Sequence, residues 1–283
     1  MRDLLELTKP RITILILICT GAGYLFGSRN LFEFSILAHV LLGTALMASG
    51  TSALNQWYEA ESDAKMRRTR ERPIAAGRMK RSHGFLFSVV LSTGGFVELW
   101  LGANPLAAAL GLFTLLSYML LYTPLKRRSP LCTTVGALPG AMPPLIGYAA
   151  ARGSLDAGAL ALFLILFVWQ FPHFYAIAWM YREDYAKGGI KMLPVVEPDG
   201  ESTARRIVAG SLLLIPISLA PRLLGMTGLV YPIVATAAGL ALLYFGIRLG
   251  RERTLSRARH VLLASVFYLP ALLAVMVLDR HTF

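Results

Sequence analysis

The chain contains nine apolar runs, each close to the roughly 20 residues that a helix needs to cross a membrane. They fall at 12–28, 34–54, 84–102, 105–121, 131–151, 158–180, 207–221, 228–247 and 260–278. Only 16% of the 283 residues are charged and 55% are hydrophobic, so too few charged side chains exist to cover a water-soluble domain. We therefore predict an all-α, polytopic membrane protein with nine transmembrane helices in a single domain, 1–283.

The basic residues are distributed unequally between the two sides of such a bundle. The amino terminus and the connections 55–83, 122–130, 181–206 and 248–259 hold 24 of the 28 Lys and Arg, and the remaining connections hold 4. Basic residues favour the cytoplasmic side of a membrane. We predict a cytoplasmic amino terminus, and topology accounts for most of the net charge of +12 without nucleic acid.

Three oxygen-bearing side chains follow the second apolar run. Asn55, Glu59 and Asp63 spread over about 80° of one helix face, because each helical residue adds about 100°. Glu61 points to the opposite side, so we interpret it as a solvated acid. Few, hard oxygen ligands are typical of Mg²⁺ shared with a substrate phosphate.

Basic side chains follow these acids at once, in a run that ends at Pro73. They are Lys65, Arg67, Arg68, Arg70 and Arg72. Carboxylates that hold Mg²⁺ beside guanidinium groups that hold phosphate oxygens would form a site for a diphosphate. The alternative is a charged loop whose acids and bases only pair with one another.

The run from Asn55 to Pro73, N-x-x-x-E-x-x-x-D-x-K-M-x-R-T-x-x-R-P, resembles the first signature of the UbiA-type superfamily of intramembrane aromatic prenyltransferases. Within the superfamily it is similar to the haem farnesyltransferases. The superfamily usually has Asp where this chain has Glu59, a change that keeps the carboxylate and lengthens its arm. The resemblance implies a UbiA-like helical bundle with cytoplasmic cap loops.

Other segments carry the same resemblance. They are Thr8-Lys9-Pro10-Arg11, Tyr122 to Arg127 (Y-T-P-L-K-R), Gly136 to Tyr148, Gln170 to Tyr185, and the G-G-I-K-M-L-P-V-V that follows. The resemblance implies that loops 55–83 and 181–206 are the active-site loops. Tyr122 and Lys126 end a helix on the same side of the membrane as both loops, which favours a catalytic role.

The second long loop bears on the acceptor. Quinone-forming relatives typically have D-x-x-x-D there, whereas Asp184 is followed four residues later by Gly188, as in the haem farnesyltransferases. Lys187 and Lys191 are i, i+4 neighbours if this loop is helical, and they then reach a phosphate or belong to a solvated face.

One histidine lies inside the sixth apolar run. His173 stands in Phe-Pro-His-Phe, where an ionisable group is costly and marks a functional site by default. A neutral imidazole there either ligates haem iron or hydrogen-bonds a carbonyl group beside Pro172.

The resemblance implies Mg²⁺-dependent transfer of the farnesyl group of farnesyl diphosphate to a vinyl group of haem B, with water addition, giving haem O. We expect metal ligation by Asn55, Glu59, Asp63 and Asp184, and haem contact by His173. The residues expected to act in catalysis are Arg68, Arg72, Tyr122, Lys126 and Lys191, with Arg11, Lys65 and Lys187 as further diphosphate ligands. We expect a bacterial inner-membrane enzyme that faces the cytoplasm, with a haem A synthase or a terminal oxidase assembly factor as partner.

Two alternatives stay open. The first is a UbiA-type prenyltransferase acting on an aromatic quinone precursor, which the missing second Asp disfavours. The second is a haem or lipid transporter. The acids and bases lie at one membrane face instead of being distributed through the spans, which disfavours a transport pathway.

Overall fold

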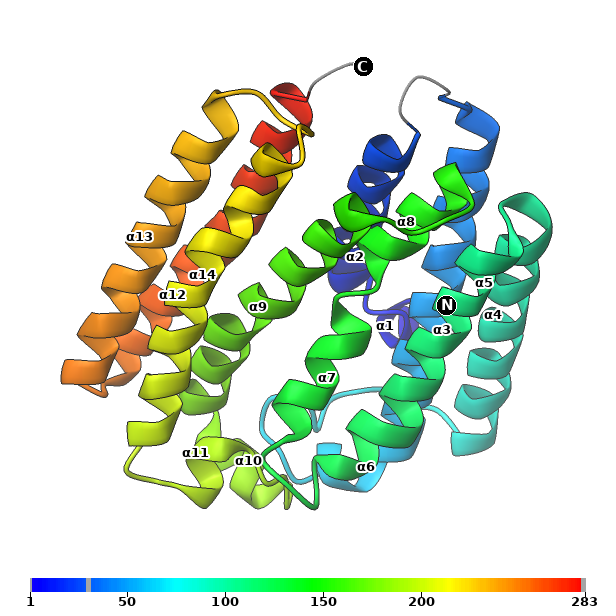
Figure 1. The fold of residues 1–283 in the computed structure, drawn as a ribbon. Coiled ribbons are helices and arrows are strands. Elements are labelled where there is room, and N and C mark those ends of the chain that lie inside the picture. The colour runs from blue at the N-terminus through cyan, green and yellow to red at the C-terminus, as the bar shows by residue number, and fades with distance from the viewer. Residues whose placement is uncertain (1, 29–31, 281–283) are drawn as a thin grey trace.

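The computed structural model describes residues 2–28 and 32–280, and within these ranges the regular elements are helices (Figure 1). In the first half they are α1 (Arg2–Leu7), α2 (Pro10–Gly27), α3 (Phe34–Asp63), α4 (Arg81–Gly102), α5 (Pro105–Leu116), the π-helix η1 (Ser117–Tyr122), α6 (Thr123–Leu125), α7 (Cys132–Gly140) and α8 (Pro143–Arg152). In the second half they are α9 (Ala157–Met180), α10 (Arg182–Lys187), α11 (Leu193–Val196), α12 (Glu201–Leu223), α13 (Val230–Arg251) and α14 (Leu255–Leu278).

Eight helical stretches of the described chain are long and apolar enough to cross a membrane. They are α2, α3, α4, Pro105–Leu125, α9, α12, α13 and α14. Large apolar side chains such as Leu101, Phe267 and Leu278 are exposed on these helices, as expected where lipid replaces water. The predicted all-α membrane fold is therefore confirmed.

The predicted span 131–151 is not one continuous helix. It forms the two short helices α7 and α8, which are separated at Ala141 and Met142. Pro143 and Pro144 begin α8, and proline lacks the N–H group that would continue a preceding helix. The predicted count of nine helices is thus approximate, because the fifth span is a pair of short helices, whereas α12 continues through Pro216 and Pro221.

Glycines let α2 and α8 cross with their backbones nearly touching. A Cβ atom added to Gly147 would lie 1.9 Å from the carbonyl oxygen of Thr20, and one added to Gly23 would lie 2.0 Å from that of Pro144. Small residues allow such close approach in membranes, where packing replaces the hydrophobic effect between helices. This crossing buries α8 and holds the broken fifth segment in place.

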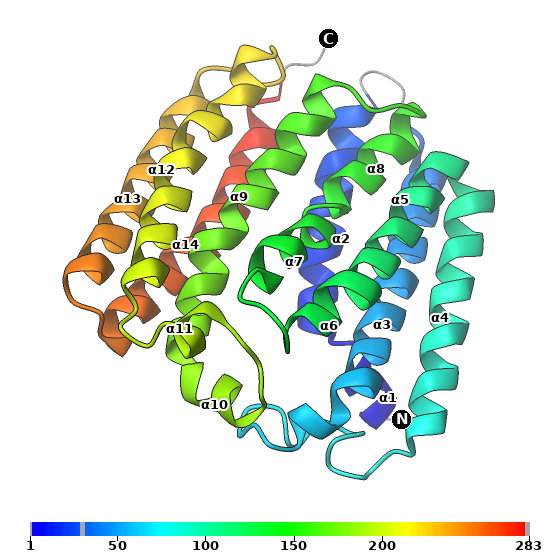
Figure 2. The same cartoon turned by 60° about the horizontal axis from the view of Figure 1, so that its bottom comes forward.

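The bundle has two sides joined through α9. Figures 1 and 2 show α12, α13 and α14 together on one side and α3, α4 and α5 on the other, with α9 between them. Helix α9 packs against α12 and α14, and also against α7 and α8. Asp156 caps α9 by accepting hydrogen bonds from the N–H groups of Gly158 and Ala159.

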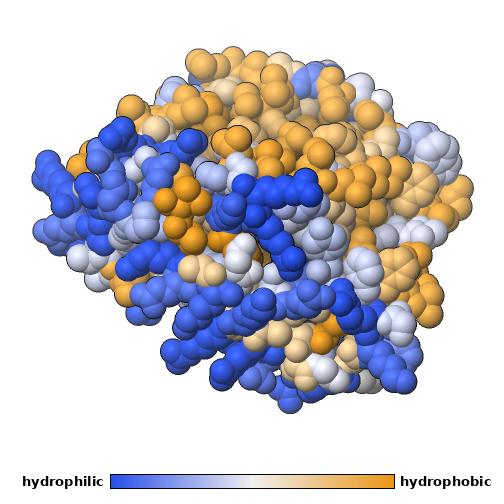
Figure 3. Space-filling view, turned by 90° about the horizontal axis from the view of Figure 1, so that it is seen from below, coloured by the Kyte–Doolittle hydropathy of each residue, from blue (hydrophilic) through white to orange (hydrophobic). Residues whose placement is uncertain are grey.

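One end of the bundle is strongly polar, and we call it the basic face. It consists of α1, the loop 64–80, α6, α10 and α11. Figure 3 shows hydrophilic side chains gathered there when the molecule is seen from below. Both predicted active-site loops belong to this face, whereas Arg29, counted above for the opposite side, lies outside the described residues.

Candidate active site

The last turns of α3 carry Asn55, Glu59 and Asp63 on one buried face. Their exposed fractions are 2%, 7% and 1%, respectively. Glu61, between them, is exposed and pairs with Arg81 at 3.2 Å, as expected for a solvated acid. Two carboxylates buried at a helix end require compensating charge, because an unpaired buried charge is very costly.

Lys126 supplies that charge to Glu59. Its Nζ atom lies 2.8 Å and 3.1 Å from the two carboxylate oxygens. Burial favours the neutral amine, but the Glu59 carboxylate reverses this effect and holds the pKa of Lys126 well above its ordinary value. Lys126 is therefore an ammonium group at neutral pH.

The π-helix η1 surrounds the Lys126 ammonium with aromatic rings. Nζ lies 4.5 Å from the ring centre of Tyr122 and 5.9 Å from that of Tyr118. Tyr118 and Tyr122 are spaced i, i+4 and share one side of η1, a π-helix of the kind that is frequent at functional sites. Gly136 leaves room for them, since a Cβ atom there would lie 2.6 Å from the Tyr122 ring.

Arg72 forms the second buried ion pair. Its Nη1 atom lies 2.7 Å from Oδ2 of Asp63. Thr69 donates a hydrogen bond to the Asp63 carbonyl oxygen and thereby folds the loop back over the end of α3. Oδ1 of Asp63 is buried and has no hydrogen-bond partner. A buried carboxylate oxygen without a partner has a free position for a metal ion or a donor.

Lys9 brings a third cation from the amino-terminal segment. Its Nζ atom lies 3.5 Å from Oδ1 of Asn55. Lys9 adopts left-handed backbone angles (φ 48°), a costly conformation for a residue other than glycine, just before Pro10 begins α2. Burial, followed by the positive charges of Arg72 and Lys126, lowers the pKa of Lys9 to about 7.

Asp184 joins the two active-site loops. It accepts hydrogen bonds from the backbone N–H groups of Arg67 and Arg68, at 3.3 Å and 3.1 Å. Arg68 also donates to the Tyr185 hydroxyl group and lies over the ring of Tyr181. The structure thus brings Asp184 and Arg68 together.

The position four residues after Asp184 is closely packed against Met66. A Cβ atom on Gly188 would lie 2.9 Å from Sδ and 3.0 Å from Cγ of the buried Met66. The methionine side chain would have to move before a carboxylate side chain could stand at position 188. This packing goes with the single acid of this loop, in place of the quinone-forming D-x-x-x-D pattern.

The other predicted site residues are less closely tied to the two carboxylates. The Lys191 N–H group donates to the Lys126 carbonyl oxygen at 2.7 Å, but its side chain is exposed. Arg11, Lys65 and Lys187 are also exposed. Because their side chains are exposed whereas Glu59 and Asp63 are buried, we place them at the rim of the site.

His173 lies on α9 inside the bundle and faces α14. Its Nδ1 atom is 2.9 Å from the Ser265 hydroxyl oxygen, and its ring stacks on Trp169. Because Ser265 donates its own proton to the Leu262 carbonyl oxygen, it accepts from Nδ1–H. This assignment leaves Nε2 of His173 with a free lone pair.

The donor set fits a shared metal ion better than a metal held by protein alone. No three acidic, histidine or cysteine side chains in the described chain are grouped closely enough to hold a metal ion by themselves. Asn55, Glu59 and Asp63 nevertheless offer oxygen ligands on one face, and Asp63 has a free oxygen. Mg²⁺ commonly takes one or two carboxylates and completes its shell with water and phosphate.

Sequence reasoning missed two residues of this arrangement. Lys9 was not predicted as a site residue and appeared only within the motif Thr8 to Arg11, because no sequence pattern predicts its left-handed backbone. Tyr118 was missed although it is spaced i, i+4 from Tyr122 and i, i+8 from Lys126, a spacing that places all three on one helix face. For Lys9, its place just before the helix-starting Pro10 was the available clue.

Comparison with known proteins places this geometry in a family. Residues 16–274 match the model of the UbiA prenyltransferase family. The chain is 58% identical over 289 residues to the protoheme IX farnesyltransferase of Solibacter usitatus, covering 99% of each chain. It is 48% identical to the protein of that name from Koribacter versatilis, covering 99% of this chain and 94% of the relative.

Solved structures share the fold. A digeranylgeranylglyceryl phosphate synthase superposes with a TM-score of 0.82 at 19% identity, covering 98% of this chain and 97% of that one. A UbiA homolog from Archaeoglobus fulgidus bound to GPP and Mg²⁺ superposes with a TM-score of 0.71 at 15% identity, covering 97% and 99%.

Proposed function

The chain belongs to the UbiA prenyltransferase family, and from that premise we propose that it transfers the farnesyl group of farnesyl diphosphate to a vinyl group of haem B. The products are haem O and diphosphate. The observation that carries the proposal is the pairing of two buried carboxylates with two cations, Glu59 with the buried Lys126 and Asp63 with the half-buried Arg72. These are the two charge types that a metal–diphosphate complex needs.

The basic residues bind and neutralise the diphosphate. Lys126 and Arg72 lie beside the carboxylates, and Lys9 approaches from α2. As the allylic C–O bond breaks, negative charge grows on the departing diphosphate, and these cations stabilise it from fixed positions. Asn55, Glu59, Asp63 and Asp184 are the residues that would hold Mg²⁺, which would supply Lewis-acid assistance to the same departure.

The remaining steps of the reaction need no reagent other than water. The farnesyl cation forms a carbon–carbon bond with the terminal vinyl carbon of haem B. Water then adds to the adjacent carbon and loses a proton, which leaves a hydroxyethylfarnesyl side chain. The rings of Tyr118 and Tyr122 face the Lys126 ammonium beside the proposed diphosphate site, where their negative faces would also stabilise the allylic cation.

The haem acceptor is supported by two features of the chain. Relatives that are 58% and 48% identical carry the name protoheme IX farnesyltransferase, and Gly188, packed against Met66, stands where quinone-forming enzymes have their second acid. We assign the free Nε2 of His173 to the haem iron. In a haem titration, His173→Ala should then lose the absorption signature of nitrogen-ligated iron, whereas His83→Ala should retain it.

The membrane orientation follows from charge. The 24 basic residues on the active-site side indicate that this side faces the cytoplasm of a bacterial plasma membrane. Farnesyl diphosphate, an anionic amphiphile, is then reached from the inner leaflet. The product haem O passes to a haem A synthase or to a terminal oxidase assembly factor.

An acceptor competition separates this function from its closest alternative. Proteoliposomes receive labelled farnesyl diphosphate, Mg²⁺ and equal amounts of haem B and 4-hydroxybenzoate. We expect label in the haem fraction alone. Label in the benzoate fraction would favour the aromatic quinone precursor, and uptake of haem into the vesicles without transfer of label would favour a transporter.

A further inference from the structure

We propose that the outer surface of α2 binds one anionic phospholipid, with its phosphate between Arg2 and Arg11 and an acyl chain in a groove between α2 and α3. This site adjoins the metal and diphosphate site described above, because Lys9 also lines the charged hollow, and it assigns Arg11 to a lipid phosphate instead of to the substrate diphosphate. It depends on two neighbouring hollows in the surface, one charged and one apolar, that meet along the same helix.

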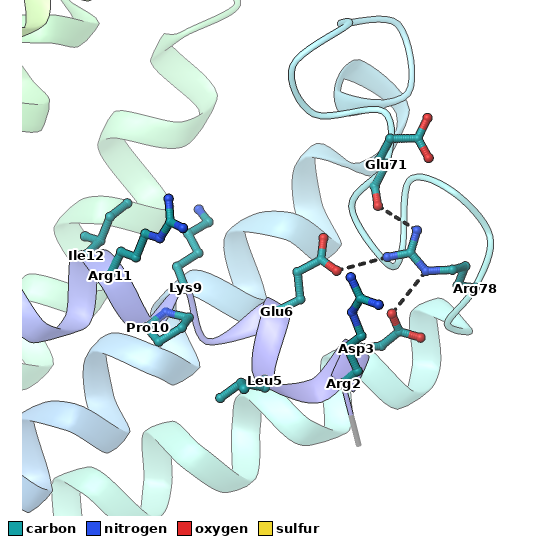
Figure 4. A pocket seen from close by; sticks show the side chains of 10 residues that line it. All are labelled: Arg2, Asp3, Leu5, Glu6, Lys9, Pro10, Arg11, Ile12, Glu71 and Arg78. Carbon is teal, nitrogen blue, oxygen red and sulfur yellow. Dashed lines mark hydrogen bonds and ion pairs between the residues drawn. The ribbon is translucent and has the colours of Figure 1, made fainter.

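The charged hollow is a cavity of about 1080 Å³ at the basic face. Figure 4 shows that α1, the first turn of α2 and the loop carrying Glu71 and Arg78 line it. Arg78 is fully engaged, with Asp3 and Glu6 each at 3.0 Å. Glu71 pairs with Arg70 outside the lining.

Two cations in this cavity are left without a partner. The side chains of Arg2 and Arg11 form no ion pair or hydrogen bond with the described residues, and both are exposed. The acids of the cavity form ion pairs with Arg78, which is shared between Asp3 and Glu6, and with Arg70. The hollow therefore presents two unpaired guanidinium groups, which bind phosphate well because of their planar fork of donors.

The apolar hollow continues along α2. It is a groove of about 350 Å³ lined by Ile14, Ile18, Gly21 and Leu25 of α2 and by Leu37 and Leu41 of α3. Gly21 forms its floor, since even an added Cβ atom would be 4.0 Å from Leu41. The spacing of the α2 residues puts them on the side of the helix that carries Arg11.

The dimensions suit a lipid tail. Arg11 and Leu25 are 14 residues apart, which is about 21 Å along a helix and more than half of a hydrocarbon core of about 30 Å. Ile14 and Ile18 are 58% and 52% exposed, so the groove opens to the surrounding bilayer. An acyl chain of a lipid in the leaflet beside the basic face fits along the stretch of α2 from Arg11 to Leu25.

The short helix α1 sets the depth of the head group. Leu4 and Leu5 are exposed on it, next to Arg2, as in helices that lie at the membrane interface. The phosphate level of the leaflet then coincides with Arg2 and Arg11. A farnesyl diphosphate molecule has a similar shape, but its diphosphate is drawn to the buried cations at Glu59 and Asp63.

The test is native mass spectrometry of the full chain, with phosphatidylglycerol or phosphatidylcholine added to the detergent-purified protein. We expect one tightly retained phosphatidylglycerol. The double variant Arg2→Gln/Arg11→Gln should weaken its retention by roughly 30-fold, about fivefold for each arginine. Ile18→Trp, which fills the groove, should remove the bound lipid.

Matched controls carry the same changes elsewhere. Arg128→Gln/Arg251→Gln removes two exposed arginines from outside the cavity, and Leu240→Trp enlarges an exposed residue of α13. Both should retain the lipid, and melting curves check that every variant is folded. Equal retention of the two lipids, or unchanged retention in the arginine double variant, would overturn the proposal.

Two further outcomes decide between ligands. If farnesyl diphosphate, added without metal, displaces phosphatidylglycerol, the groove belongs to the prenyl substrate and the phospholipid proposal is wrong. If it does not, the lipid site stands. Either result is obtained without an activity measurement, so it is independent of whether the chain makes haem O.

Discussion

Lys126 holds both carboxylate oxygens of Glu59, with its Nζ atom at 2.8 Å and 3.1 Å. The side chains are 11% and 9% exposed, respectively, so the pair lies largely out of water. A proposed metal ligand is thus neutralised by a proposed diphosphate ligand. The same relationship recurs between Asp63 and Arg72, and it gives the site a balanced charge before substrate arrives.

Removing one charge of the buried Glu59–Lys126 pair should lower the free energy of unfolding, and removing both charges should lower it less. Glu59→Gln and Lys126→Met each leave a buried charge without its partner, for which a loss of about 3–5 kcal/mol is typical. The double variant removes both charges. Thermal melting in detergent should show large decreases for the single variants and a partial recovery for the double variant.

The control for this cycle is Glu61→Gln. Glu61 forms an exposed pair with Arg81, so its removal should leave the melting temperature nearly unchanged. Equal decreases for Glu59→Gln and Glu61→Gln would show that the Lys126 pair has no special role in the fold.

Metal binding should depend on diphosphate. Glu59 and Asp63 are engaged by Lys126 and Arg72 in the substrate-free protein, and a diphosphate draws these cations away from them. Electron paramagnetic resonance with Mn²⁺ as the probe should show binding that is at least tenfold tighter when inorganic diphosphate is present. Lys126→Met should bind Mn²⁺ alone more tightly than the unaltered protein.

The opposite pattern would contradict this coupling. Mn²⁺ affinity that is independent of diphosphate, with no gain in Lys126→Met, would mean that the ion pairs do not compete with the metal. No binding in any mixture would instead count against the metal site itself.

Diphosphate binding should take up a proton at mildly alkaline pH. The lowered pKa of Lys9, about 7, means that its ammonium form predominates below pH 7 and is lost as the pH rises through 7. A bound diphosphate favours the charged form, so at pH 8 binding returns a proton to Lys9. Calorimetry in buffers of different ionisation enthalpy should detect this uptake.

The variants isolate Lys9 from the titration of diphosphate itself. On binding diphosphate, Lys9→Met should take up fewer protons than the unaltered protein. Lys65→Met, which changes an exposed lysine, should take up as many protons as the unaltered protein. Identical proton uptake in all three proteins would contradict the assignment of the titrating group to Lys9.

Gly136 should be needed for activity although it carries no side chain. A Cβ atom there would lie 2.6 Å from the Tyr122 ring, so Gly136→Ala must displace the ring that faces Lys126. We expect kcat to fall about tenfold or more, because misplacing a catalytic group by about 1 Å costs up to 100-fold. Gly94→Ala, where the added atom meets open space, should keep full activity in the same assay.

Much of this arrangement could be predicted from the sequence because it depends on helical periodicity. Asn55, Glu59 and Asp63 share a face because they are spaced i, i+4 along a helix. The apolar runs are long enough to predict membrane-spanning helices. The break between α7 and α8 was missed, although Pro143 and Pro144 signal it, because hydropathy continues across it. Contacts such as Lys126 with Glu59 join residues 67 positions apart, and no local pattern predicts them.

Mass spectrometry of extracted haem tests the central claim most directly. Membranes containing the unaltered chain, Glu59→Gln or Asp63→Asn receive haem B, farnesyl diphosphate and Mg²⁺, with Glu61→Gln as the control. We predict haem O from the unaltered chain and from Glu61→Gln, and at most a trace from the other two. Absence of haem O from the unaltered chain beside a working positive control, or full haem O formation by Glu59→Gln and Asp63→Asn, would contradict the account.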